Sequence, residues 1–434
     1  MDSLERYTSW FRGSTPYISA HRGKTFVVFL GGDALMHSNL VNIVHDLALL
    51  SVLGVRLAIV HGARPQLNDA LNDSLFHDGR RITSASEMQE VSAIFGALRA
   101  KLEALFSTGL PNTPLHNVEI NIASGNFIAA NPVGIIDGVD HQRTGWPRSV
   151  NIDAMKKLLD TQAIILQSPV GFSASGQAFN LAAEELAAEL AIALKADKLI
   201  VFNNPGQITD ARHQRISRIT PERLNGLCTD LDPITAARCE ALIAANTQGV
   251  ERAHLVAFAS DGALLQELFT ADGIGTQVSA HSGDLIRQAR FEDVADIVEI
   301  IRPLEEAGVL VPRSRTQLEQ EIAHFFIAEL DGVVVGCCAI YTFADAAELA
   351  CVAVHENYRH QYSAMGIGGA LLEAAERAAE AHGAKSLFVL TTQTQEWFVS
   401  HGFSPADVES LPQSKQSLYN WQRGSAVLQK SLNF

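Results

Sequence analysis

The stretch of sequence that decides the fold of the C-terminal third is ELACVAVHENYRHQYSAMGIGGALL, residues 348–372. Its first part is apolar and contains β-branched residues, which predicts a buried strand. Its last part, Gly366-Ile367-Gly368-Gly369, leads into a helix with an apolar face. The first turn of a helix has unpaired backbone N–H groups at the positive end of the helix dipole, and glycines let the backbone approach a phosphate closely. We therefore expect this region to hold a pyrophosphate.

The composition narrows the class of protein. The 434 residues suggest two or three domains, and a hydrophobic content of 47% is enough to build full cores. The net charge of −15, without a basic patch, argues against a nucleic-acid partner or an anionic membrane. No apolar run reaches membrane-spanning length, and the N-terminus lacks a signal-peptide core. Five cysteines without paired spacing or a Cys/His cluster predict reduced thiols in the cytoplasm and no metal site.

Apolar strands alternate with helices from residue 25 to about residue 280. This alternation predicts an α/β domain with a parallel sheet that is covered on both faces. Before it, residues 4–12 have the spacing of a short helix that Pro16 ends, docked either on its own domain or on another subunit. We expect strands at 25–30, 56–60, 118–122, 163–166 and 198–202, and helices at 39–53, 66–73, 86–106 and 181–195.

The pattern changes after a linker at 279–283. The segments that follow predict a mixed α+β domain with an antiparallel meander. The expected elements are a strand at 285–289, a helix at 291–306, a hairpin of 325–330 and 333–341 around an Asp-Gly turn, a strand at 348–354, a helix at 366–382 and a strand at 386–390.

This second domain, over residues 285–434, resembles the GNAT acyl-CoA N-acetyltransferases. The resemblance rests on the order of Val352-Ala353-Val354, Tyr358-Arg359, Gly366-Ile367-Gly368, Trp397-Phe398 and Gly402-Phe403. It implies that the strand pairs with the pantetheine amides of acetyl-CoA and that the glycine turn binds the pyrophosphate. The acetyl-CoA contacts it implies are Cys351, Val352, Ala353, Val354, Arg359, Gly366, Gly368 and Gly369.

Two positions depart from the usual pattern of that family. Ser363 stands where a Gln or Arg usually precedes the glycine turn, and Arg359 can supply the missing charge. Trp397-Phe398 stands where many members have Phe-Tyr, whose tyrosine protonates the leaving thiolate. Thr391 and Tyr419 are the alternative acids.

Glu348 is the candidate catalytic base. An acceptor amine must lose a proton before it attacks a thioester, and Glu348 stands near the start of the central strand, where the amine is expected to arrive. The alternative is a solvated carboxylate at the edge of the strand. Cys351 lies on the same strand, and we interpret it as a small buried residue rather than a nucleophile.

Residues 22–280 resemble the amino-acid kinase family, acetylglutamate kinase in particular. The resemblance rests on Phe29-Leu30-Gly31-Gly32, His61-Gly62-Ala63-Arg64-Pro65 and the strand that starts at Lys198. Phe29 replaces the lysine that steadies the transferring phosphoryl group in that family, and Asn203-Asn204 replaces Thr-Asp. The resemblance therefore implies a regulatory domain without kinase activity.

Other segments resemble the arginine-regulated members of the kinase family. These are the N-terminal aromatic helix with Tyr7, Trp10 and Phe11, and the segment of Gly273-Ile274-Gly275-Thr276. The resemblance implies that the aromatic helix joins subunits and that arginine binds beside it. The contacts it implies are Tyr17, Lys198, Glu267, Gly273 and Gly275.

The two domains together have the layout of the bacterial N-acetylglutamate synthase family. That resemblance implies an arm at 1–21, a kinase-like domain at 22–280 and an acetyltransferase domain at 285–434. It implies acetyl transfer from acetyl-CoA to L-glutamate as the first step of arginine biosynthesis, inhibition by L-arginine, and a homo-oligomer, specifically a hexamer. The glutamate contacts it implies are Arg313, Thr391 and Arg423. The alternatives are an acetyltransferase for another amino acid and an arginine-sensing regulator with a relic GNAT domain.

Overall fold

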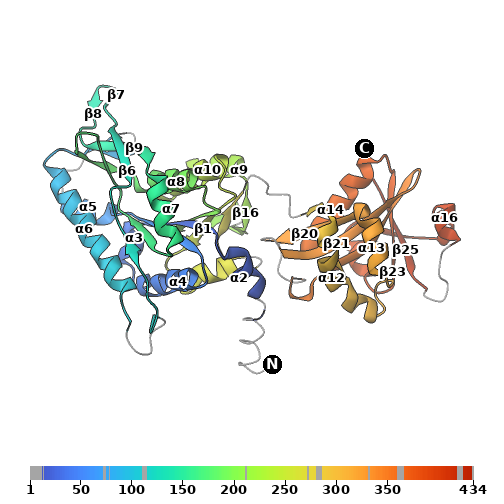
Figure 1. The fold of residues 1–434 in the computed structure, drawn as a ribbon. Coiled ribbons are helices and arrows are strands. Elements are labelled where there is room, and N and C mark those ends of the chain that lie inside the picture. Colours follow the sequence, from blue (N-terminus) through green and yellow to red (C-terminus); the bar gives the residue numbers. More distant parts are fainter. Residues whose placement is uncertain are drawn as a thin grey trace. The chain divides into compact units, whose positions relative to one another are not determined.

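A computed structural model describes residues 12, 14–71, 75–77, 79–109, 115–210, 213–270, 273–279, 286–330, 333–358, 366–417 and 424–432. The chain forms two compact units, Met1–Ser282 and Gly283–Phe434, each with its own hydrophobic core (Figure 1). The first is built on a largely parallel sheet and the second is mixed α+β, so the predicted fold class is confirmed. None of the helices in the described part of the chain combines the length and apolar character of a membrane span.

The first unit is built on an eight-stranded sheet in the order β16-β18-β17-β13-β1-β2-β10-β5. Every neighbouring pair in this sheet is parallel except β17 and β18. The sheet strands are β1 (Thr25–Leu30), β2 (Arg56–His61), β5 (Ile122–Ala123), β10 (Ile164–Gln167), β13 (Lys198–Asn203), β16 (Arg218–Ile219), β17 (Arg252–Ala257) and β18 (Thr276–Val278).

Helices cover both faces of this sheet, as continuous apolar strands require. Val27 and Phe29 of β1 belong to the core that α8 and α10 complete, whereas Phe26 points the other way and meets the His21 ring of α2. The helices are α2 (Thr15–His21), α3 (Gly32–Met36), α4 (Leu40–Val52), α5 (Arg64–Ala70), α6 (Glu87–Phe106), α7 (Ile152–Asp160), α8 (Ala183–Leu194), α9 (Pro221–Leu227), α10 (Pro233–Thr247), α11 (Ala263–Phe269) and the short 3-10 helix Cys228–Asp230.

The sequence did not predict a small closed barrel of β11, β12, β9 and β6. Its strands are short and half exposed, so they lack the apolar runs that revealed the main sheet. The barrel strands are β6 (Ile128–Pro132), β9 (Thr144–Val150), β11 (Val170–Phe172) and β12 (Ala178–Leu181). The remaining short strands are β3 (Phe76–His77), β4 (Arg80–Arg81), β7 (Ile135–Ile136), β8 (Val139–Asp140), β14 (Ile208–Thr209) and β15 (Arg215–Ile216).

Two local predictions in the first unit were wrong. Residues 118–121 form no strand, because the edge strand β5 is only Ile122–Ala123. The helix expected at 66–73 begins at Arg64 and ends at Ala70. Pro16 lies in the first turn of α2, where its missing N–H costs nothing. The helix expected at 4–12 falls outside the described residues except for residue 12, and so does most of the linker at 279–283.

The second unit is built on a seven-stranded sheet in the order β19-β20-β21-β22-β23-β25-β24, in which only β22 and β23 are parallel. The predicted meander is therefore present. The strands are β19 (Ile286–Gln288), β20 (Phe325–Leu330), β21 (Val333–Thr342), β22 (Ala346–Val354), β23 (Ser386–Thr391), β24 (Ser404–Ala406) and β25 (Ala426–Ser431).

The helix expected at 291–306 is a short 3-10 turn, Phe291–Asp293, followed by α12 (Val294–Glu306). The buried side of α12 joins a core with β20, β21 and β22. The other helices of the unit are α13 (Arg315–Glu321), α14 (Gly366–Ala381), α15 (Gln395–Ser400) and α16 (Gln413–Gln416), with 3-10 turns at Ile322–His324, Glu356–Tyr358 and Val408–Ser410.

Candidate functional site

β22 and β23 lie side by side only at their beginnings. Residues 346–348 pair with residues 386–388, and the pairing stops there although β22 continues to Val354 and β23 to Thr391. The other edge of β22 stays paired with β21 up to Val354. Among the described residues, segment 349–353 therefore has no strand partner on the side of β23. Such an edge can accept an extended ligand that carries amide groups.

A β-bulge interrupts β22 within this open segment. Ala350 pairs with Ala339 and Ala353 with Cys337, so two residues of β22 stand opposite Cys338 alone. The first of the two, Cys351, has a φ of +53°, a left-handed conformation that is unfavourable for a residue with a Cβ. Its thiol is buried, as expected for a packing residue. The bulge changes which backbone groups point outward beyond Glu348.

Glu348 is buried, with only 6% of its surface exposed, so it is not the solvated edge carboxylate of the alternative interpretation. Its Oε2 lies 2.6 Å from Lys415 Nζ. This contact is an ion pair rather than an aligned hydrogen bond, because Oε2 has no hydrogen-bond partner among the described residues. Lys415 Nζ also lies 5.7 Å from the centre of the Tyr341 ring. Burial and this ion pair fix the position of the carboxylate that the sequence predicts as the base.

Tyr341 extends this polar group on the neighbouring strand β21. Its hydroxyl donates a hydrogen bond to Glu321 Oε2 at 2.5 Å, and burial together with that bond raises the pKa of Tyr341. Tyr341 stands opposite Glu348 in the sheet register. Sequence reasoning missed Lys415, Tyr341 and Glu321, since the three belong to distant segments and no motif joins them.

Arg313 lies beside the bulge. Burial alone would lower the pKa of its guanidinium, but Cys351, Tyr341 and Glu321 nearby raise it. Its backbone N–H donates to Glu305 Oε1 at 2.8 Å, which fixes the segment that precedes α13. The structure therefore brings a predicted glutamate contact to the same end of β22 as the predicted acetyl-CoA contacts. A permanently charged guanidinium here can receive a carboxylate.

Thr391 closes β23, three residues past the last residue paired with β22. Its Oγ1 lies 2.8 Å from Thr394 Oγ1 and accepts from the backbone N–H of Thr394 at 3.1 Å, so its orientation is fixed. By contrast, Arg315 pairs with Glu319 one helical turn away, as expected for a surface charge. Arg359, Ser363, Tyr419 and Arg423 lie outside the described residues.

Two glycines at the start of α14 have different roles. Gly366 has a φ of +65°, which favours glycine, and open space surrounds the position of a Cβ. A Cβ on Gly368 would lie 3.2 Å from the Trp397 ring, so this glycine allows α15 to pack on the helix start. The N–H groups of the first turn of this 16-residue helix are the predicted site for the pyrophosphate.

A second cluster in the first unit surrounds Glu267. Its Oε2 accepts the backbone N–H groups of Ile274 and Gly275, both at 2.8 Å, and its Oε1 lies 2.7 Å from His254 Nδ1. Burial would raise the pKa of Glu267, but these donors outweigh it and lower the pKa. A Cβ on Gly273 would lie 2.2 Å from Oε2, so only glycine lets the loop close on the carboxylate.

Lys198 and Tyr17 are buried beside this cluster. Burial and the charge of Arg252 lower the pKa of Lys198 to about 7, against the attraction of Glu267. Tyr17 lies in α2, which is held to α11 by a contact of 2.9 Å from His21 Nε2 to the Leu268 carbonyl oxygen. The five predicted arginine contacts therefore lie on α2, β13, α11 and the loop after α11. Sequence reasoning missed His21 and His254.

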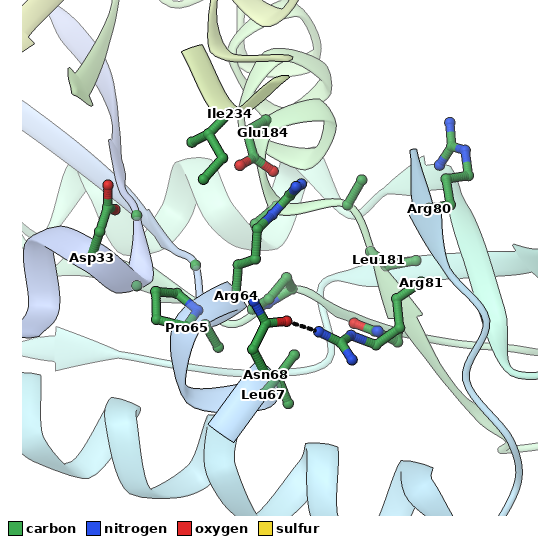
Figure 2. A pocket seen from close by; sticks show the side chains of 18 of the residues that line it. Asp33, Arg64, Pro65, Leu67, Asn68, Arg80, Arg81, Leu181, Glu184 and Ile234 are labelled. Atoms are coloured by element: carbon green, nitrogen blue, oxygen red, sulfur yellow. Dashed lines mark hydrogen bonds between the residues drawn. The ribbon is translucent and has the colours of Figure 1, made fainter. Parts of the chain in front are cut away.

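Phe29 is buried at the end of β1 beneath Arg238, whose guanidinium carbon lies 5.7 Å from the centre of the ring. Arg238 pairs with Asp33 at 2.6 Å and donates to Asn203 Oδ1 at 2.6 Å. A Cβ on Gly31 would lie only 2.2 Å from Arg238 Nη2. The Arg238 and Asp33 side chains therefore pack directly against Gly31, at the pocket that Figure 2 shows.

Two family models match the chain, one in each unit. Residues 24–235 match the amino acid kinase family, and residues 321–405 match the acetyltransferase (GNAT) domain. The fold and the site thus define a GNAT acetyltransferase that carries an amino acid kinase-like unit.

Relatives that match over the full length of the chain identify the family within this class. An amino-acid acetyltransferase of Aeromonas salmonicida is 43% identical over 435 residues and covers 98% of both chains. One of Pseudomonas fluorescens is 44% identical over 436 residues, with coverage of 99% and 100%. The chain belongs to the amino-acid acetyltransferase family.

Solved structures similar to this chain include two of an N-acetylglutamate synthase. The N-acetylglutamate synthase of Neisseria gonorrhoeae in complex with coenzyme A and L-arginine is 33% identical and matches with a TM-score of 0.87, covering 99% of this chain and 100% of its own. The same enzyme with coenzyme A and N-acetyl-glutamate matches with a TM-score of 0.64 at the same coverage.

Proposed function

We propose that the chain transfers the acetyl group of acetyl-CoA to the amino group of L-glutamate, giving N-acetyl-L-glutamate and coenzyme A. The observation that carries this proposal is the position of Glu348, a buried carboxylate at the point where β22 leaves β23. The Neisseria gonorrhoeae enzyme, which binds coenzyme A and N-acetyl-glutamate, supports the choice of substrates.

The open edge of β22 is the acetyl-CoA site of this proposal. Segment 349–353 pairs with the pantetheine amides and directs backbone N–H groups at the thioester oxygen, where negative charge develops in the transition state. The first turn of α14, with Gly366, Gly368 and Gly369, binds the pyrophosphate, and Arg359 adds charge. Cys351 to Val354 contribute backbone groups, so the buried thiol of Cys351 takes no part in the chemistry.

The reaction is a direct attack in a ternary complex. Glu348 takes a proton from the glutamate ammonium, and the free amine adds to the thioester carbonyl carbon. The nitrogen then gives its remaining extra proton to solvent, the C–S bond breaks, and the electron pair leaves with the coenzyme A sulfur, which is protonated by solvent or by Thr391. The two substrate carboxylates need cationic partners, and we assign Arg313 and Arg423 to them, with the Thr391 hydroxyl as a further contact.

The kinase-like domain, residues 22–280, is the regulatory part in this proposal and has no kinase activity. Arginine binds at Tyr17, Lys198, Glu267, Gly273 and Gly275 and inhibits acetyl transfer, so the pathway product limits its first step. The complex of the Neisseria gonorrhoeae enzyme with L-arginine supports the choice of effector. We further propose that the arm, residues 1–21, joins subunits into a hexamer. The free, buried cysteines favour a cytoplasmic protein.

One assay tests this function against its alternatives. Free thiol release from acetyl-CoA is measured with each amino acid as acceptor, with and without arginine. We expect release with glutamate and inhibition by arginine. Release with a different amino acid only would identify another acetyltransferase. Binding of arginine without any release would identify an arginine-sensing regulator with a relic GNAT domain.

Glu348→Gln tests the catalytic base. The amide fills the same space but cannot take a proton, so we expect turnover to fall by about 10²–10⁴-fold while acetyl-CoA binding changes little. Asp345→Asn is the matched control, because Asp345 is an exposed carboxylate just before β22. Turnover and acetyl-CoA affinity are measured over a range of pH. Unchanged turnover of Glu348→Gln at saturating substrates would exclude Glu348 as the base.

A further inference from the structure

Tyr341 has contacts with the residues of the candidate active site, yet the reaction described above gives it no role. It stands opposite Glu348 in the register of β21 and β22, so the two side chains project from the same face of the sheet. Lys415, which pairs with Glu348, lies 5.7 Å from the centre of the Tyr341 ring. The His324 ring lies 5.0 Å from the same centre. These neighbours contact the ring, so the hydroxyl is the part of Tyr341 that needs an explanation.

The hydroxyl of Tyr341 has a fixed direction. It donates its only proton to Glu321 Oε2 at 2.5 Å. Glu321 is the last residue of α13, and its Oε1 accepts from Gln317 Nε2 at 3.0 Å, so the carboxylate is itself held in place. Because its proton is committed to Glu321, the Tyr341 oxygen can only accept further hydrogen bonds.

Arg313 is the donor that matches this oxygen. Burial would lower the pKa of Arg313, but Cys351, Tyr341 and Glu321 raise it, and the tyrosine does so in part as a hydrogen-bond partner of the guanidinium. A guanidinium carries N–H donors and no acceptor, so Arg313 donates and the tyrosine oxygen accepts. Interactions therefore run from Arg313 through Tyr341 to Glu321.

The charge of Arg313 remains available to a ligand. None of the ion pairs within the described part of the chain involves Arg313, and its guanidinium donates to the Val311 carbonyl oxygen at 3.2 Å. A carboxylate paired directly with Arg313 would occupy the fork of N–H groups that a substrate carboxylate needs. A tyrosine oxygen orients the guanidinium without neutralising it.

Arg313 also needs such an anchor. It lies between α12 and α13, in a segment that forms neither helix nor strand. A long side chain on such a segment has many rotamers, and binding is weaker when those rotamers must be given up as the ligand binds. Tyr341 belongs to β21, which is paired on both sides, so it is a rigid point of attachment.

We propose that Tyr341 is a positioning residue whose hydroxyl, oriented by Glu321, holds the Arg313 guanidinium ready for a carboxylate of the acceptor amino acid. The inference rests on the acceptor contact that is proposed for Arg313. It adds Tyr341 and Glu321 to the residues that determine the affinity for the acceptor. Neither of them forms or breaks a bond.

Steady-state kinetics of the full-length protein test this role, with thiol release as the readout. Tyr341→Phe keeps the ring but removes the acceptor oxygen. We expect the KM for glutamate to rise about tenfold, while kcat and the KM for acetyl-CoA change less than about twofold. The unchanged KM for acetyl-CoA shows that the variant is folded.

Substitutions at Glu321 test the second part of the chain of contacts. Glu321→Ala should raise the KM for glutamate as Tyr341→Phe does. Glu321→Gln should stay closer to wild type, because its amide oxygen can still accept the hydroxyl proton. Glu319→Gln is the matched control, since Glu319 is a carboxylate of the same helix that pairs with Arg315.

A double variant separates a role through Arg313 from a general structural role. Arg313→Gln alone should raise the KM for glutamate. Adding Tyr341→Phe should then raise it by less than about twofold, because the guanidinium that Tyr341 positions is gone. The inference is overturned if Tyr341→Phe leaves the KM for glutamate unchanged, if it raises both KM values equally, or if its effect is undiminished in the Arg313→Gln background.

Failure of the proposed function gives a different result. Wild-type protein without glutamate-dependent thiol release would refute the acetylation of glutamate, and an unchanged KM for glutamate in Arg313→Gln would refute the Arg313 contact. Either result would overturn this inference as well. Failure of the inference alone leaves both the wild-type release and the effect of Arg313→Gln in place.

Discussion

The pairing of Glu348 with Lys415 places two opposite charges at the beginning of the open edge of β22. The ammonium nitrogen of Lys415, Nζ, lies 2.6 Å from Oε2 of the Glu348 carboxylate. The amine of the substrate is also an ammonium before it loses its proton. Lys415 holds the Glu348 carboxylate in place through this ion pair.

Lys415→Met tests this positioning role. Without the ammonium group, the Glu348 side chain loses the partner that holds its position, so turnover should fall several-fold while the KM for acetyl-CoA changes little. Lys415→Arg keeps the charge and should restore most of the activity. Lys385→Met, at an exposed lysine paired with Asp345, is the control. Unchanged turnover in Lys415→Met would show that Lys415 does not position Glu348.

Sequence reasoning singled out Glu348 because it is a carboxylate near the start of the central strand, where the acceptor amine is expected to arrive. It did not identify Lys415, which is 67 positions further along the chain in a four-residue helix, α16. A contact between two such residues depends on how β22 and the segment before β25 fold together. The same reason explains why Tyr341 and Glu321 were missed.

Among the elements, β22 is the one that the function depends on most. Its bulge gives Cys351 a φ of +53° and lies within the edge left open by β23. The left-handed conformation costs roughly 1 kcal/mol or more for a residue with a Cβ, and most for a β-branched one. The bulge persists because β22 is paired with β21 both before and after it, and this pairing holds the backbone of Cys351 in place.

A substitution series at Cys351 measures this cost. We expect Cys351→Gly to withstand thermal inactivation at least as well as Cys351→Ala, and Cys351→Val to be the least stable, by about 1 kcal/mol or more. The valine variant should also raise the KM for acetyl-CoA. Ala350→Val is the control, because valine suits the regular strand position before the bulge. If Cys351→Val matches Cys351→Ala in stability and KM, the bulge is not strained.

The strands and helices with continuous apolar spacing were predicted well, as β1, β2, β13 and α6 show. The small barrel of β6, β9, β11 and β12 was not, since its short strands carry no such spacing. The bulge in β22 was also beyond prediction, because it arises from the register between two strands.

For the whole molecule, the proposed regulation separates two sets of residues. The Glu267 cluster lies in the first unit and the acetyl-transfer residues lie in the second. An effector that binds the first and inhibits the second requires a coupling free energy between them. Substitutions in the cluster should then change the response to arginine without changing the chemistry.

Tyr17→Cys tests this separation. The buried ring of Tyr17 should cover the aliphatic part of arginine, so its loss should weaken inhibition at least tenfold while acetyl transfer without arginine stays near wild type. Tyr17→Phe keeps the ring and should stay sensitive. The readout is thiol release at increasing arginine concentration. Full sensitivity in Tyr17→Cys would count against this site.

The pH dependence of arginine binding tests the role of Lys198. Burial lowers the pKa of Lys198 to about 7, so its side chain is charged below pH 7 and neutral above it. A carboxylate ligand favours the charged form. Arginine affinity should therefore be highest below pH 7 and decrease as the pH rises above 7, with uptake of a proton on binding.

His21 and His254 do not contribute in this range, since burial lowers the pKa of each to about 4. Lys198→Met should flatten the pH dependence and abolish the proton uptake, which calorimetry in buffers of different ionisation enthalpy measures. A wild-type protein that binds arginine without proton uptake at pH 8 would contradict a contact between the ligand carboxylate and Lys198.

The sequence by itself determined the two fold classes, the order of the main strands and helices, the family and the identity of Glu348 as the candidate base. These properties follow from local patterns, because the spacing of apolar residues and the short glycine and aromatic motifs involve residues that are close in sequence. Only the tertiary structure decided that Glu348 is buried against Lys415 and that β22 leaves β23 just beyond it. Those features come from contacts between distant segments, whose geometry depends on how complete sheets and helices pack.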